Sequence, residues 1–516
     1  MAKICLTLTA KTLSRNLEIL DKYRKFADIA ELRVDCLEPD ERLLIRRFPE
    51  QAGLPVILAI RRTVDGGFFE SGEGARINLM ARGLAYADAD KRRNFAYLDI
   101  EEDMNVPSLE EAAHTFGTRI IRSYHNLADT DIDLPAKIRT MRHSAGDIVK
   151  IAIMTKSIRD VLKLFRAGKE NPEQEKILIA MGHYGVCSRI LAEQFGSFLS
   201  YTSAYSEPEI PQAAPGQIDV RELDQLYRFR NITHATKVYG VTGYPLFSTE
   251  SPRFFNAIFR IEEIDAVYVP FPADSINICM ELMRELNVKG LSITVPYKET
   301  VISFLDGQTA NVQDIGACNT ISLDSQGWSG INTDAKGFSD SLLAFTGRTH
   351  LKRQRITVIG AGGSARAVVS ELYRLGAKVL ILNRTAYKAR DLAAPYRFSW
   401  GGLDTRSIEM INKYRDIIIQ TTSAGMQGNT SNGGTASAGS GSFDDPLAMY
   451  SFCGREDVMD IIYKPEMTPF LTRAANAGCR VQNGFDMLIR QAKYQYTHFT
   501  GKEFPEHLLS RVRFGE

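Results

Sequence analysis

Short apolar runs recur through the first two hundred residues, and segments with apolar residues at helical spacing separate most of them. The runs are Ile4–Leu8, Ile29–Val34, Pro55–Ile60, Phe95–Ile100, Arg119–Ser123, Ile148–Met154, Ile177–Met181 and Ser197–Thr202. The helix-like segments include Leu13–Tyr23, Ile77–Ala87, Ile158–Ala167 and Ser188–Gln194. Alternating strands and helices predict a parallel α/β sheet. Eight such units favour a closed (β/α)8 TIM barrel, with a doubly wound open sheet as the competing fold.

A lysine interrupts the sixth of these runs. Lys150 has aliphatic neighbours on both sides in the segment Ile148–Met154. A strand that is apolar on both faces is buried on both faces in a parallel α/β sheet, and burial disfavours the charged form of a lysine. A neutral amine can attack a carbonyl and form a Schiff base. The alternative is a lysine at a strand end whose ammonium reaches water along its apolar stem.

Polar residues stand within or just after most of the other strands, at the end where a barrel carries its active site. They are Glu31, Arg33, Arg61, Asp99, His125, Arg189 and Gln217. Any one of them could be a solvated strand end, but their convergence on one lysine and one histidine indicates a site. An iminium acidifies the adjacent C–H, so His125 is a candidate to take that proton and later deliver it to a leaving hydroxyl. The arginines suit an anionic substrate, because a planar guanidinium matches a carboxylate.

The second half contains a strand, Arg355–Ile359, which runs into a glycine-rich turn and then a helix-like stretch, Arg366–Leu375. The turn has the G-x-G-x-x-A form of the dinucleotide fingerprint in its strand–turn–helix setting. Its glycines let the backbone approach a pyrophosphate, whose charge the helix N-terminus favours. We therefore predict a Rossmann domain with cofactor contacts at Gly360, Gly362, Gly363, Ser364 and Ala365.

The next strand, Lys378–Leu382, ends in Asn383, Arg384 and Thr385. An NAD-specific site usually has an acidic residue here, which binds the ribose 2′-hydroxyl. Arg384 instead offers a cation to a 2′-phosphate, which predicts NADP(H) as the cofactor, and Thr385 can add a hydroxyl contact. Lys388 and Arg390 are weaker candidates for the same phosphate.

Hydroxyl, amide, ammonium and carboxylate groups are spread over several segments upstream of this turn. They belong to Thr249, Ser251, Thr294, Lys298, Asn319 and Asp334. Such a set suits a polyhydroxylated acid. A carboxylate close to Lys298 would hold the pair in defined protonation states while a substrate hydroxyl loses its proton.

Residues 1 to about 220 resemble type I 3-dehydroquinate dehydratase. The resemblance rests on Glu31–Asp35, Arg61, Asp65-Gly66-Gly67, Ser123-Tyr124-His125, Lys150, the segment Met181–Arg189 and Ala214–Gln217. It implies Lys150 as the Schiff-base lysine, His125 as general acid/base and Asp65 as the carboxylate that orients this histidine. Substrate-contacting positions match Glu31, Arg33, Arg61, Arg189 and Gln217. Asp65 is one methylene shorter than the family's usual Glu, and Ala213 stands where many members have Ser.

Residues from about 237 onward resemble shikimate dehydrogenase. The resemblance implies Lys298 and Asp334 as the catalytic pair and hydride transfer between NADP(H) and a ring carbon. The substrate-binding positions that it implies are Thr249, Ser251, Thr294, Asn319, Tyr463 and Gln491. Gly484, in the segment Asn483–Gln491, is counted with the cofactor-binding positions, and Thr421–Met426 resembles the loop on the cofactor side. Thr249 replaces the family's usual Ser, which keeps the hydroxyl and adds a methyl group.

Composition narrows the class of protein further. The 516 residues are 44% hydrophobic and 24% charged, as in a globular protein, and exceed what one hydrophobic core holds. A net charge of +1 gives no electrostatic case for nucleic acid or an acidic membrane surface. We see no membrane-length apolar run and no targeting segment at the start. Seven scattered cysteines fit reduced thiols better than disulfides or a zinc cluster, so we expect a cytoplasmic protein without a metal.

The expected domains are a barrel at 1–222, a linker at 223–237, a substrate-binding domain at 238–346 plus 484–516, and a Rossmann domain at 347–483. Residues 427–442 are rich in Gly, Ser, Asn and Thr and cannot bury an apolar face, so we expect a flexible loop beside the cofactor cleft. A lid is the functional alternative for this loop.

The two resemblances name consecutive reactions. We therefore expect a bifunctional enzyme, a monomer or homodimer, that converts 3-dehydroquinate to 3-dehydroshikimate and then to shikimate in aromatic amino acid biosynthesis. One alternative is a second half that prefers quinate. Another is a metabolite-sensing regulator built from inactive copies of both enzymes, but Lys150, His125, Lys298 and Asp334 are all present and no basic extension is appended.

Overall fold

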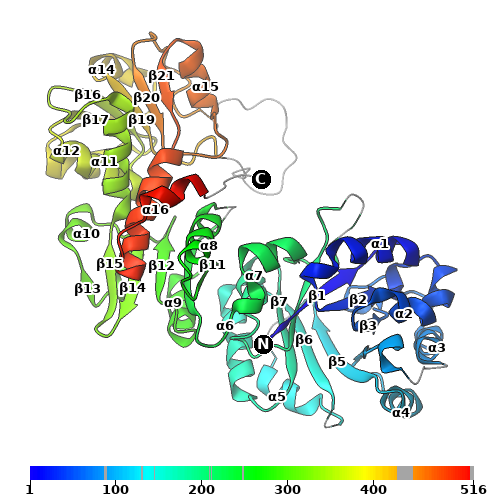
Figure 1. Ribbon diagram of the computed structural model, residues 1–516. Coiled ribbons are helices and arrows are strands. Elements are labelled where there is room, and N and C mark those ends of the chain that lie inside the picture. The colour runs from blue at the N-terminus through cyan, green and yellow to red at the C-terminus, as the bar shows by residue number, and fades with distance from the viewer. Residues whose placement is uncertain are drawn as a thin grey trace. The chain divides into compact units, whose positions relative to one another are not determined.

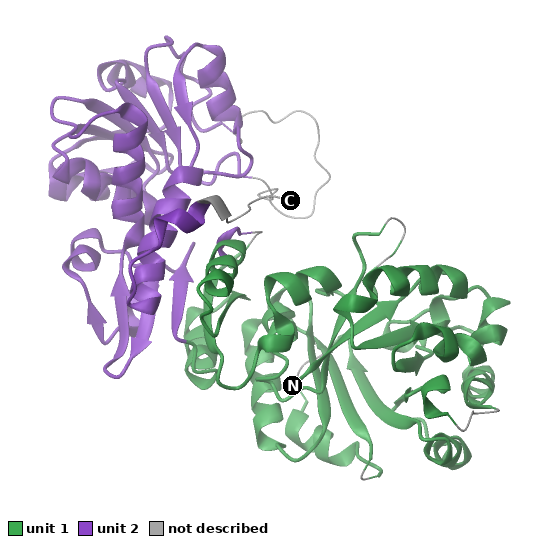
Figure 2. Ribbon diagram, viewed as in Figure 1, with its two compact units in different colours: residues 1–246, 252–288, 512–516 green, residues 247–251, 289–511 purple. Residues whose placement is uncertain are grey.

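The chain divides into two compact units in the computed structural model. The structure describes residues 1–85, 90–128, 132–144, 146–207, 210, 212–246, 249–426 and 445–511. Residues 1–246 and 252–288 belong to unit 1, and residues 247–251 and 289–511 to unit 2 (Figure 2). The domain boundaries expected from the sequence stay predictions beside this division. The Gly/Ser-rich segment 427–442 lies outside the described residues.

Unit 1 contains a parallel sheet whose strands follow one another in chain order, within the described residues (Figure 1). The strands are β1 (Lys3–Leu8), β2 (Ile29–Arg33), β3 (Val56–Ala59), β4 (Tyr97–Glu101), β5 (Arg119–Asn126), β6 (Ile148–Met154), β7 (Lys176–Met181), β8 (Leu199–Ser203) and the short β9 (Ile218–Asp219). β8 pairs in parallel with β1. A parallel bridge between Lys176 and Ser197, reinforced by the Phe198 N–H donating to the Lys176 carbonyl at 2.6 Å, joins the β7 edge to the chain entering β8.

This strand order confirms the barrel. A doubly wound sheet would place later strands on both sides of β1, whereas here each strand lies beside its sequence neighbour and the two edges meet. The continuous apolar runs are explained by burial, since β2, β3, β7 and β8 are buried along their whole length. The closed parallel sheet brings the carboxyl ends of all the strands to one rim.

Helices connect the barrel strands, and local sequence signals mark where they begin. They are α1 (Leu13–Tyr23), α2 (Phe48–Ala52), α3 (Glu73–Leu84), α4 (Pro107–Thr115), α5 (Leu134–Thr140), α6 (Ile158–Glu170) and α7 (Val186–Ile190). Thr12 caps α1 by accepting from the Arg15 N–H. Ser157 and Asp160 form a capping box at the start of α6. These caps satisfy backbone donors that a helix start leaves unpaired.

Unit 1 also contains the parallel pair β10 (Lys237–Gly243) and β11 (Ala266–Pro272), with α8 (Ser251–Ile261, whose first residue belongs to unit 2) and α9 (Ile276–Glu285). Helix α6 of the barrel packs against α9. Arg166 on α6 donates to Glu281 and to Glu285 on α9. The Asp274 carboxylate accepts from the Ile158 N–H at 3.0 Å, at the first residue of α6. The barrel is therefore joined to β10 and β11 by directed polar contacts within one compact unit.

Unit 2 begins with an antiparallel ladder and continues into a parallel sheet. The ladder joins β12 (Gly290–Ile293) to β14 (Thr320–Asp324) and β14 to β15 (Gly327–Ile331), and β13 (Gly307–Gln308) pairs in parallel with β15. The parallel sheet has the order β18-β17-β16-β19-β20-β21 in the described residues. Its strands are β16 (Arg355–Ile359), β17 (Lys378–Asn383), β18 (Ser399–Gly402), β19 (Ile417–Gln420), β20 (Asp457–Asp460) and β21 (Arg480–Gln482).

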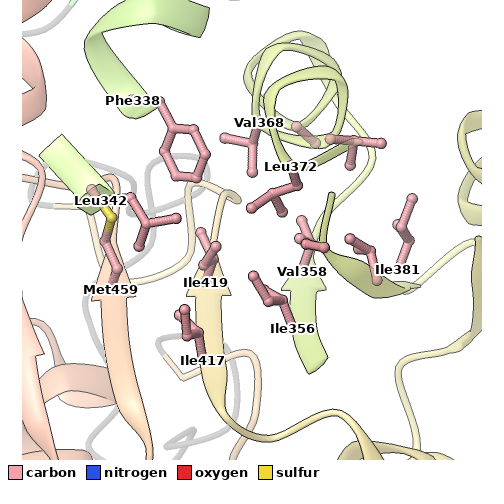
Figure 3. Packing of buried hydrophobic residues seen from close by; sticks show 14 of the residues in the cluster. Phe338, Leu342, Ile356, Val358, Val368, Leu372, Ile381, Ile417, Ile419 and Met459 are labelled. Atoms are coloured by element: carbon pink, nitrogen blue, oxygen red, sulfur yellow. The ribbon is translucent and has the colours of Figure 1, made fainter. Parts of the chain in front are cut away.

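The parallel sheet has the Rossmann pattern expected from the glycine-rich turn, and the helices of unit 2 pack against this sheet or beside the antiparallel ladder. They are α10 (Ala310–Ile315), α11 (Thr333–Thr346), α12 (Gly363–Arg374), α13 (Ala386–Ala393), α14 (Ile408–Lys413), α15 (Pro469–Asn476) and α16 (Phe485–Thr500). Figure 3 shows apolar side chains of β16 and β19, such as Val358 and Ile419, packed against Leu372 of α12 and Phe338 of α11. This core fixes the start of α12 above the end of β16.

A glycine in the turn after β7 tests the packing of the barrel. A Cβ on Gly185 would lie 1.9 Å from the Ala180 carbonyl oxygen, so Gly185→Ala has to push the turn and α7 away from β7. We expect the free energy of unfolding to fall by about 1–3 kcal/mol, as in other overpacked sites. The measurement is the thermal unfolding midpoint.

Gly74 on α3 is the matched control, because a Cβ there would meet no atom within 4 Å. Gly74→Ala is expected to raise the free energy of unfolding by about 0.5–1 kcal/mol, since alanine loses less backbone entropy in a helix. Equal midpoints for the wild type and Gly185→Ala would contradict the packing described here.

Candidate active sites

A cavity of about 260 Å³ lies at the carboxyl ends of the barrel strands. All eight residues to which the resemblance assigns a role in this half line it: Glu31, Arg33, Arg61, Asp65, His125, Lys150, Arg189 and Gln217. Apolar side chains complete the wall, among them Leu127, Met154 and Met181. The structure thus brings together side chains that are up to 186 positions apart, since Glu31 and Gln217 face the same space.

Lys150 is buried within the barrel and paired with acids. It is only 4% exposed. Its Nζ donates to the Asp99 Oδ2 atom at 2.7 Å and lies 3.8 Å from the Glu31 Oε1 atom. It also lies 4.5 Å from the centroid of the Tyr201 ring. Two carboxylates therefore lie close to this amine, an arrangement that the expectation from burial alone does not include.

Asp99 is held between two cations. Arg61 Nη2 donates to Asp99 Oδ2 at 2.8 Å, and Ser123 Oγ donates to Asp99 Oδ1 at 2.6 Å. Burial by itself would raise the pKa of Asp99, but Arg61 and Lys150 lower that pKa well below its usual value. Asp99 is therefore a fixed anion beside the lysine.

His125 borders the same cavity and contacts Arg61, whose Nη1 atom lies 3.2 Å from His125 Nδ1. A guanidinium only donates hydrogen bonds, so Nδ1 accepts and a neutral ring carries its proton on Nε2. Burial, together with the cations Arg61 and Lys150, holds the pKa of His125 well below its usual value of 6.5. The imidazole is therefore neutral at neutral pH and available as a base.

The three cavity arginines differ in their partners. Arg33 donates to both oxygens of Asp35, at 2.9 and 2.7 Å. Arg189 instead donates to the carbonyls of Pro215, at 3.2 Å, and Tyr201, at 3.5 Å. Burial lowers the pKa of Arg189 to about 10. Among the described residues Arg189 has no carboxylate partner, so its charge is available to an anionic ligand.

The loops beside the cavity place the remaining predicted residues. Asp65 lines the cavity, but its carboxylate accepts from Arg62 Nε at 2.6 Å, while the described contact of the His125 ring is with Arg61. The orienting role that the resemblance implies for Asp65 stays a prediction. Gln217 accepts from the Ala213 N–H at 3.1 Å. Ala213 is in the cavity wall, where the family's usual Ser would present a hydroxyl.

Sequence reasoning gave Asp99 no role and overlooked Glu101. Both lie on β4, where Arg61 reaches each of them at 2.8 Å. The signal was present in the sequence: two acids separated by one apolar residue, in a strand buried on both sides, point to the same side of the sheet. Tyr201, whose ring lies under Lys150, could not be distinguished from an ordinary core tyrosine.

The second site is centred on a buried ion pair in unit 2. Lys298 Nζ donates to Asp334 Oδ2 at 2.6 Å and to Ser364 Oγ at 3.1 Å. Lys298 follows β12, Asp334 lies in the first turn of α11, and Ser364 lies in the first turn of α12. A Cβ on Gly363 would come within 3.3 Å of the Lys298 side chain, so the glycine-rich turn lies directly against the lysine.

Amide and hydroxyl groups hold the acid of this pair. Asn319 Nδ2 donates to Asp334 Oδ1 at 2.8 Å and to Thr333 Oγ1 at 2.9 Å. Asn332 caps α11 by accepting from the Ala335 N–H. A carboxylate in the first turn of a helix is stabilised by the helix dipole. Asp334 is thus held with one oxygen turned to Lys298 and the other to Asn319.

Other predicted substrate residues lie in unit 2 on loops and on α16. Thr249 Oγ1 donates to Ser251 Oγ at 3.2 Å and shares a hydrogen bond with Tyr463, a tyrosine whose pKa is raised by burial. Gln491 on α16 packs against α11, because a Cβ on Gly337 would lie 2.9 Å from its backbone nitrogen. Its buried Oε1 atom has no hydrogen-bond partner among the residues that the structure describes. Thr294 accepts, through its carbonyl, from the Tyr297 N–H at 3.0 Å.

The glycine-rich turn has the geometry that a pyrophosphate requires. Gly360 has a φ of +115°, and a Cβ there would lie 2.5 Å from Thr421 Oγ1. Gly362 is the N-cap of α12, and a Cβ on it would meet no atom within 4 Å. Gly363, Ser364 and Ala365 form the first turn of that helix, where backbone N–H groups are free for an anion.

The groups at the end of β17 and the start of α16 complete the predicted cofactor set. Asn383 Nδ2 donates to the Thr385 carbonyl at 3.0 Å and closes the turn that carries Arg384. Arg384 is exposed and forms no ion pair within the part of the chain that the structure describes. A Cβ on Gly484 would lie 2.0 Å from the Ile461 carbonyl oxygen, so this glycine allows close packing at the start of α16.

Among the described residues, no helix is both long and apolar enough to span a bilayer. Within the same residues, no group of three or more His, Cys, Asp or Glu side chains is arranged to bind a metal ion.

Comparison with known families assigns both halves. Residues 4–234 match the model of type I 3-dehydroquinase. Residues 241–321 match the shikimate dehydrogenase substrate binding domain, and residues 343–428 match shikimate/quinate 5-dehydrogenase.

Curated relatives cover one or both halves. The chloroplastic bifunctional 3-dehydroquinate dehydratase/shikimate dehydrogenase of Arabidopsis thaliana is 28% identical over 99% of this chain and 84% of its own. The shikimate dehydrogenase (NADP(+)) of Maridesulfovibrio salexigens is 33% identical over 52% of this chain and 93% of its own. Among solved structures, the dehydroquinate dehydratase and shikimate dehydrogenase from S. pombe AroM is 23% identical, covering 99% of this chain and 98% of that one with a TM-score of 0.42. The chain belongs to the shikimate dehydrogenase family over its second half and joins to it a type I 3-dehydroquinase, which makes it a member of the bifunctional 3-dehydroquinase/shikimate dehydrogenases.

Proposed function

We propose that the barrel dehydrates 3-dehydroquinate to 3-dehydroshikimate and that the second half reduces this product to shikimate with NADPH. One observation carries the proposal: each half holds a buried lysine that is hydrogen-bonded to an aspartate, Lys150 to Asp99 at 2.7 Å and Lys298 to Asp334 at 2.6 Å. Around each pair lie the other residues that the two chemistries require. The descriptions of the matched families and relatives support the same assignment.

In the barrel, Lys150 is the nucleophile. Its amine, once deprotonated, adds to the substrate ketone, and loss of water leaves an iminium that joins the substrate to Nζ. The closed wall of Met154, Met181 and Tyr201 excludes bulk water from this bond. Asp99 remains an anion beside the nitrogen, so the positive charge of the iminium replaces that of the ammonium without leaving a buried charge unpaired.

His125 moves the proton. The iminium withdraws electrons from the neighbouring carbon, so the neutral imidazole can take a proton from it, and the electron pair forms an enamine. Collapse of the enamine expels the hydroxyl, which leaves as water with the proton that His125 returns. Hydrolysis of the iminium then releases the enone product and restores Lys150.

Arg189 binds the substrate carboxylate in this proposal. Its guanidinium is buried and, among the described residues, its partners are only carbonyl oxygens, so an entering carboxylate would gain a charge-assisted hydrogen bond without displacing an acid. Gln217 and Glu31 also line the cavity and offer polar groups to the substrate hydroxyls. Arg33 and Arg61 already form ion pairs with Asp35 and Asp99 of the protein. They therefore contribute positive charge near the substrate rather than a guanidinium that is available to bind it.

In the second half, the Lys298–Asp334 pair handles the proton of the substrate hydroxyl. During reduction the ring oxygen gains negative charge, and the Lys298 ammonium, fixed by Asp334 and Ser364, can donate a proton to it. In this proposal Thr249, Ser251, Tyr463 and Gln491 bind the hydroxyls and carboxylate of the ring. We also propose a cytoplasmic enzyme, which the seven free thiols support, acting as a monomer or homodimer.

The residues around the glycine-rich turn fit NADP(H). When bound, this cofactor supplies a hydride to the ring carbon. Gly360 and Gly362 leave room for the pyrophosphate against the start of α12, and Gly363 sets that turn against Lys298. Arg384 would bind the 2′-phosphate that distinguishes NADP from NAD, since its charge is not neutralised by an acid of the described chain.

Separate lysines predict separable activities. Lys150→Ala should abolish the dehydratase and keep the dehydrogenase, and Lys298→Ala should do the reverse, each because one nucleophile or proton donor is lost. Absorbance assays of the two steps on the same preparation measure this. Borohydride added with 3-dehydroquinate should trap an adduct on the wild type and on Lys298→Ala but not on Lys150→Ala; loss of both activities in either folded variant would refute the division of labour.

The lowered pKa of His125 predicts the acid side of the dehydratase pH profile. A base whose pKa lies below 6.5 stays unprotonated as the pH falls through 6.5. The acid limb of kcat/KM should therefore fall below pH 6.5. Initial rates between pH 4.5 and 8, at substrate concentrations far below KM, locate the limb; a midpoint at or above 6.5 would contradict the field that we assign to Arg61 and Lys150.

Arg384→Ala should weaken NADPH selectively. Loss of one charge-assisted contact to a phosphate is worth about 1.5–3 kcal/mol, so KM for NADPH should rise about 10- to 100-fold while KM for NADH stays unchanged. The control is Arg390→Ala, because the exposed Arg390 already pairs with Asp391 at 3.0 Å. Equal increases in KM for NADPH and KM for NADH in Arg384→Ala would show that Arg384 does not bind the 2′-phosphate.

A further inference from the structure

Ionised side chains of alternating sign connect two points of the dehydratase cavity by a path outside it. We call this path the charge chain. It consists of Lys150, Asp99, Arg61, Glu101, Arg76, Glu73, Arg62 and Asp65, each within 4.0 Å of the next. Its two end residues, Lys150 and Asp65, both line the cavity, whereas Arg76, Glu73 and Glu101 do not.

Arg76 is the middle of the charge chain and its most buried cation. The residue is 0% exposed, although it lies on the helix α3. Its Nη1 atom donates to Glu101 Oε2 and, at 3.1 Å, to the carbonyl of Ile60. Its Nε and Nη2 atoms donate to Glu73 Oε2 at 3.1 and 2.9 Å. A guanidinium that is taken fully out of water is normally paired on all sides, and here the partners are Glu101, Glu73 and the carbonyl of Ile60.

Two of these bonds act on Arg61. Glu101 is shared, since its other oxygen accepts from Arg61 Nη1 at 2.8 Å. Ile60 directly precedes Arg61, so the bond to its carbonyl fixes the backbone from which Arg61 extends. The position of Arg61 in turn decides how closely it approaches Asp99 and His125.

The outer part of the charge chain is weaker. Glu73 is 48% exposed in its side chain and meets Arg62 at 3.4 Å. Solvent screens an ion pair of this kind, so it carries little energy between Asp65 and the rest. The influence of Arg76 is therefore concentrated on the buried segment that ends at Lys150.

We propose that Arg76 is a positioning residue of the dehydratase, which holds Glu101 and the Ile60 carbonyl so that Arg61 keeps its place between Asp99 and His125. The inference rests on the proposed dehydratase function. Arg76 touches no residue with which the substrate reacts, and acts only through Arg61. An arginine suits this position because its fork spans Glu101, Ile60 and Glu73 at once, whereas a lysine ammonium would keep the charge beside Glu101 but only part of these contacts.

The readout is the pKa of the base in the reaction. His125 faces Arg61 from β3, Asp99 from β4, Lys150 from β6 and Arg33 from β2, so its protonation depends on the balance of these charges. Without Arg76, the full charge of Glu101 acts on Arg61 alone and draws it away from His125. Protonation of His125 then becomes easier, and the acid limb of kcat/KM moves to higher pH.

The test is Arg76→Met in the full chain, which removes the charge and keeps an apolar side chain of similar reach. We expect kcat of the dehydratase to fall about 10-fold or more, because small displacements of positioned groups have effects of this size. We also expect the acid limb to rise by about half a pH unit or more. The dehydrogenase rate should stay unchanged, and borohydride should still trap substrate on Lys150.

Arg122→Met is the matched control. Arg122 is also a fully buried arginine of the barrel, and it donates to Glu110 at 2.8 Å and to the Met104 carbonyl at 3.3 Å, but it belongs neither to the cavity nor to the charge chain. Its loss should destabilise the fold comparably without moving the acid limb. The inference would be overturned if the acid limb of Arg76→Met lay at or below the pH of the wild-type limb. It would also be overturned if Arg76→Met and Arg122→Met shifted the limb by the same amount.

Arg76→Lys keeps the proposal testable if Arg76→Met does not fold. It retains the charge near Glu101 but loses part of the fork, so kcat should fall less and the acid limb should stay close to the wild type. The acid limb could move to higher pH in Arg76→Lys and stay at the wild-type position in Arg122→Met. That result would contradict the role proposed for the positive charge of Arg76. A wild type that forms no borohydride adduct overturns the proposed function itself, and is thereby distinguished from failure of the inference alone.

Discussion

A lysine ammonium inside a barrel core is tolerated only with an acid beside it, and the Lys150–Asp99 pair meets this condition at 2.7 Å. Removing either charge from water is costly, and the mutual attraction offsets that cost only where further hydrogen bonds complete the set. Arg61 and Ser123 supply those bonds to Asp99, and Glu101 supplies the balancing charge to Arg61. The neutral state of His125 follows from the same arrangement, because two cations near a half-buried ring disfavour a third.

The second site uses the same pair of groups on a different support. Lys298 and Asp334 stand on a loop after β12 and on the first turn of α11, so a helix dipole and the Asn319 amide take the place that Arg61 and Ser123 have in the barrel. A barrel gathers its groups at one rim because all its strands point the same way. In unit 2 the functional residues are brought together by segments that approach one another closely. The glycine-rich turn, for example, lies against the Lys298 side chain at Gly363.

The two lysines therefore suit different chemistry. Lys150 is buried on a barrel strand and borders a cavity walled largely by apolar side chains, where the charge of a covalent bond to the substrate is matched in advance by Asp99. Lys298 lies against the turn that would bind the cofactor. In that position its ammonium can donate a proton to a substrate oxygen as negative charge develops on it. Burial with a fixed counter-ion serves covalent catalysis in one case and proton donation in the other.

The amino-acid sequence alone determined the barrel, the Rossmann sheet and eight of the residues that line the first cavity. The physical reason is that parallel strands must present their carboxyl ends at one rim, so Arg61, His125 and Lys150 are neighbours in any closed version of this order. Only the tertiary structure decided which charges pair. Asp99 and Glu101 reach Arg61 from the neighbouring strand, Arg76 enters from a helix, and Asp65 pairs with Arg62, because pairing depends on register and on side-chain reach, which no local pattern encodes.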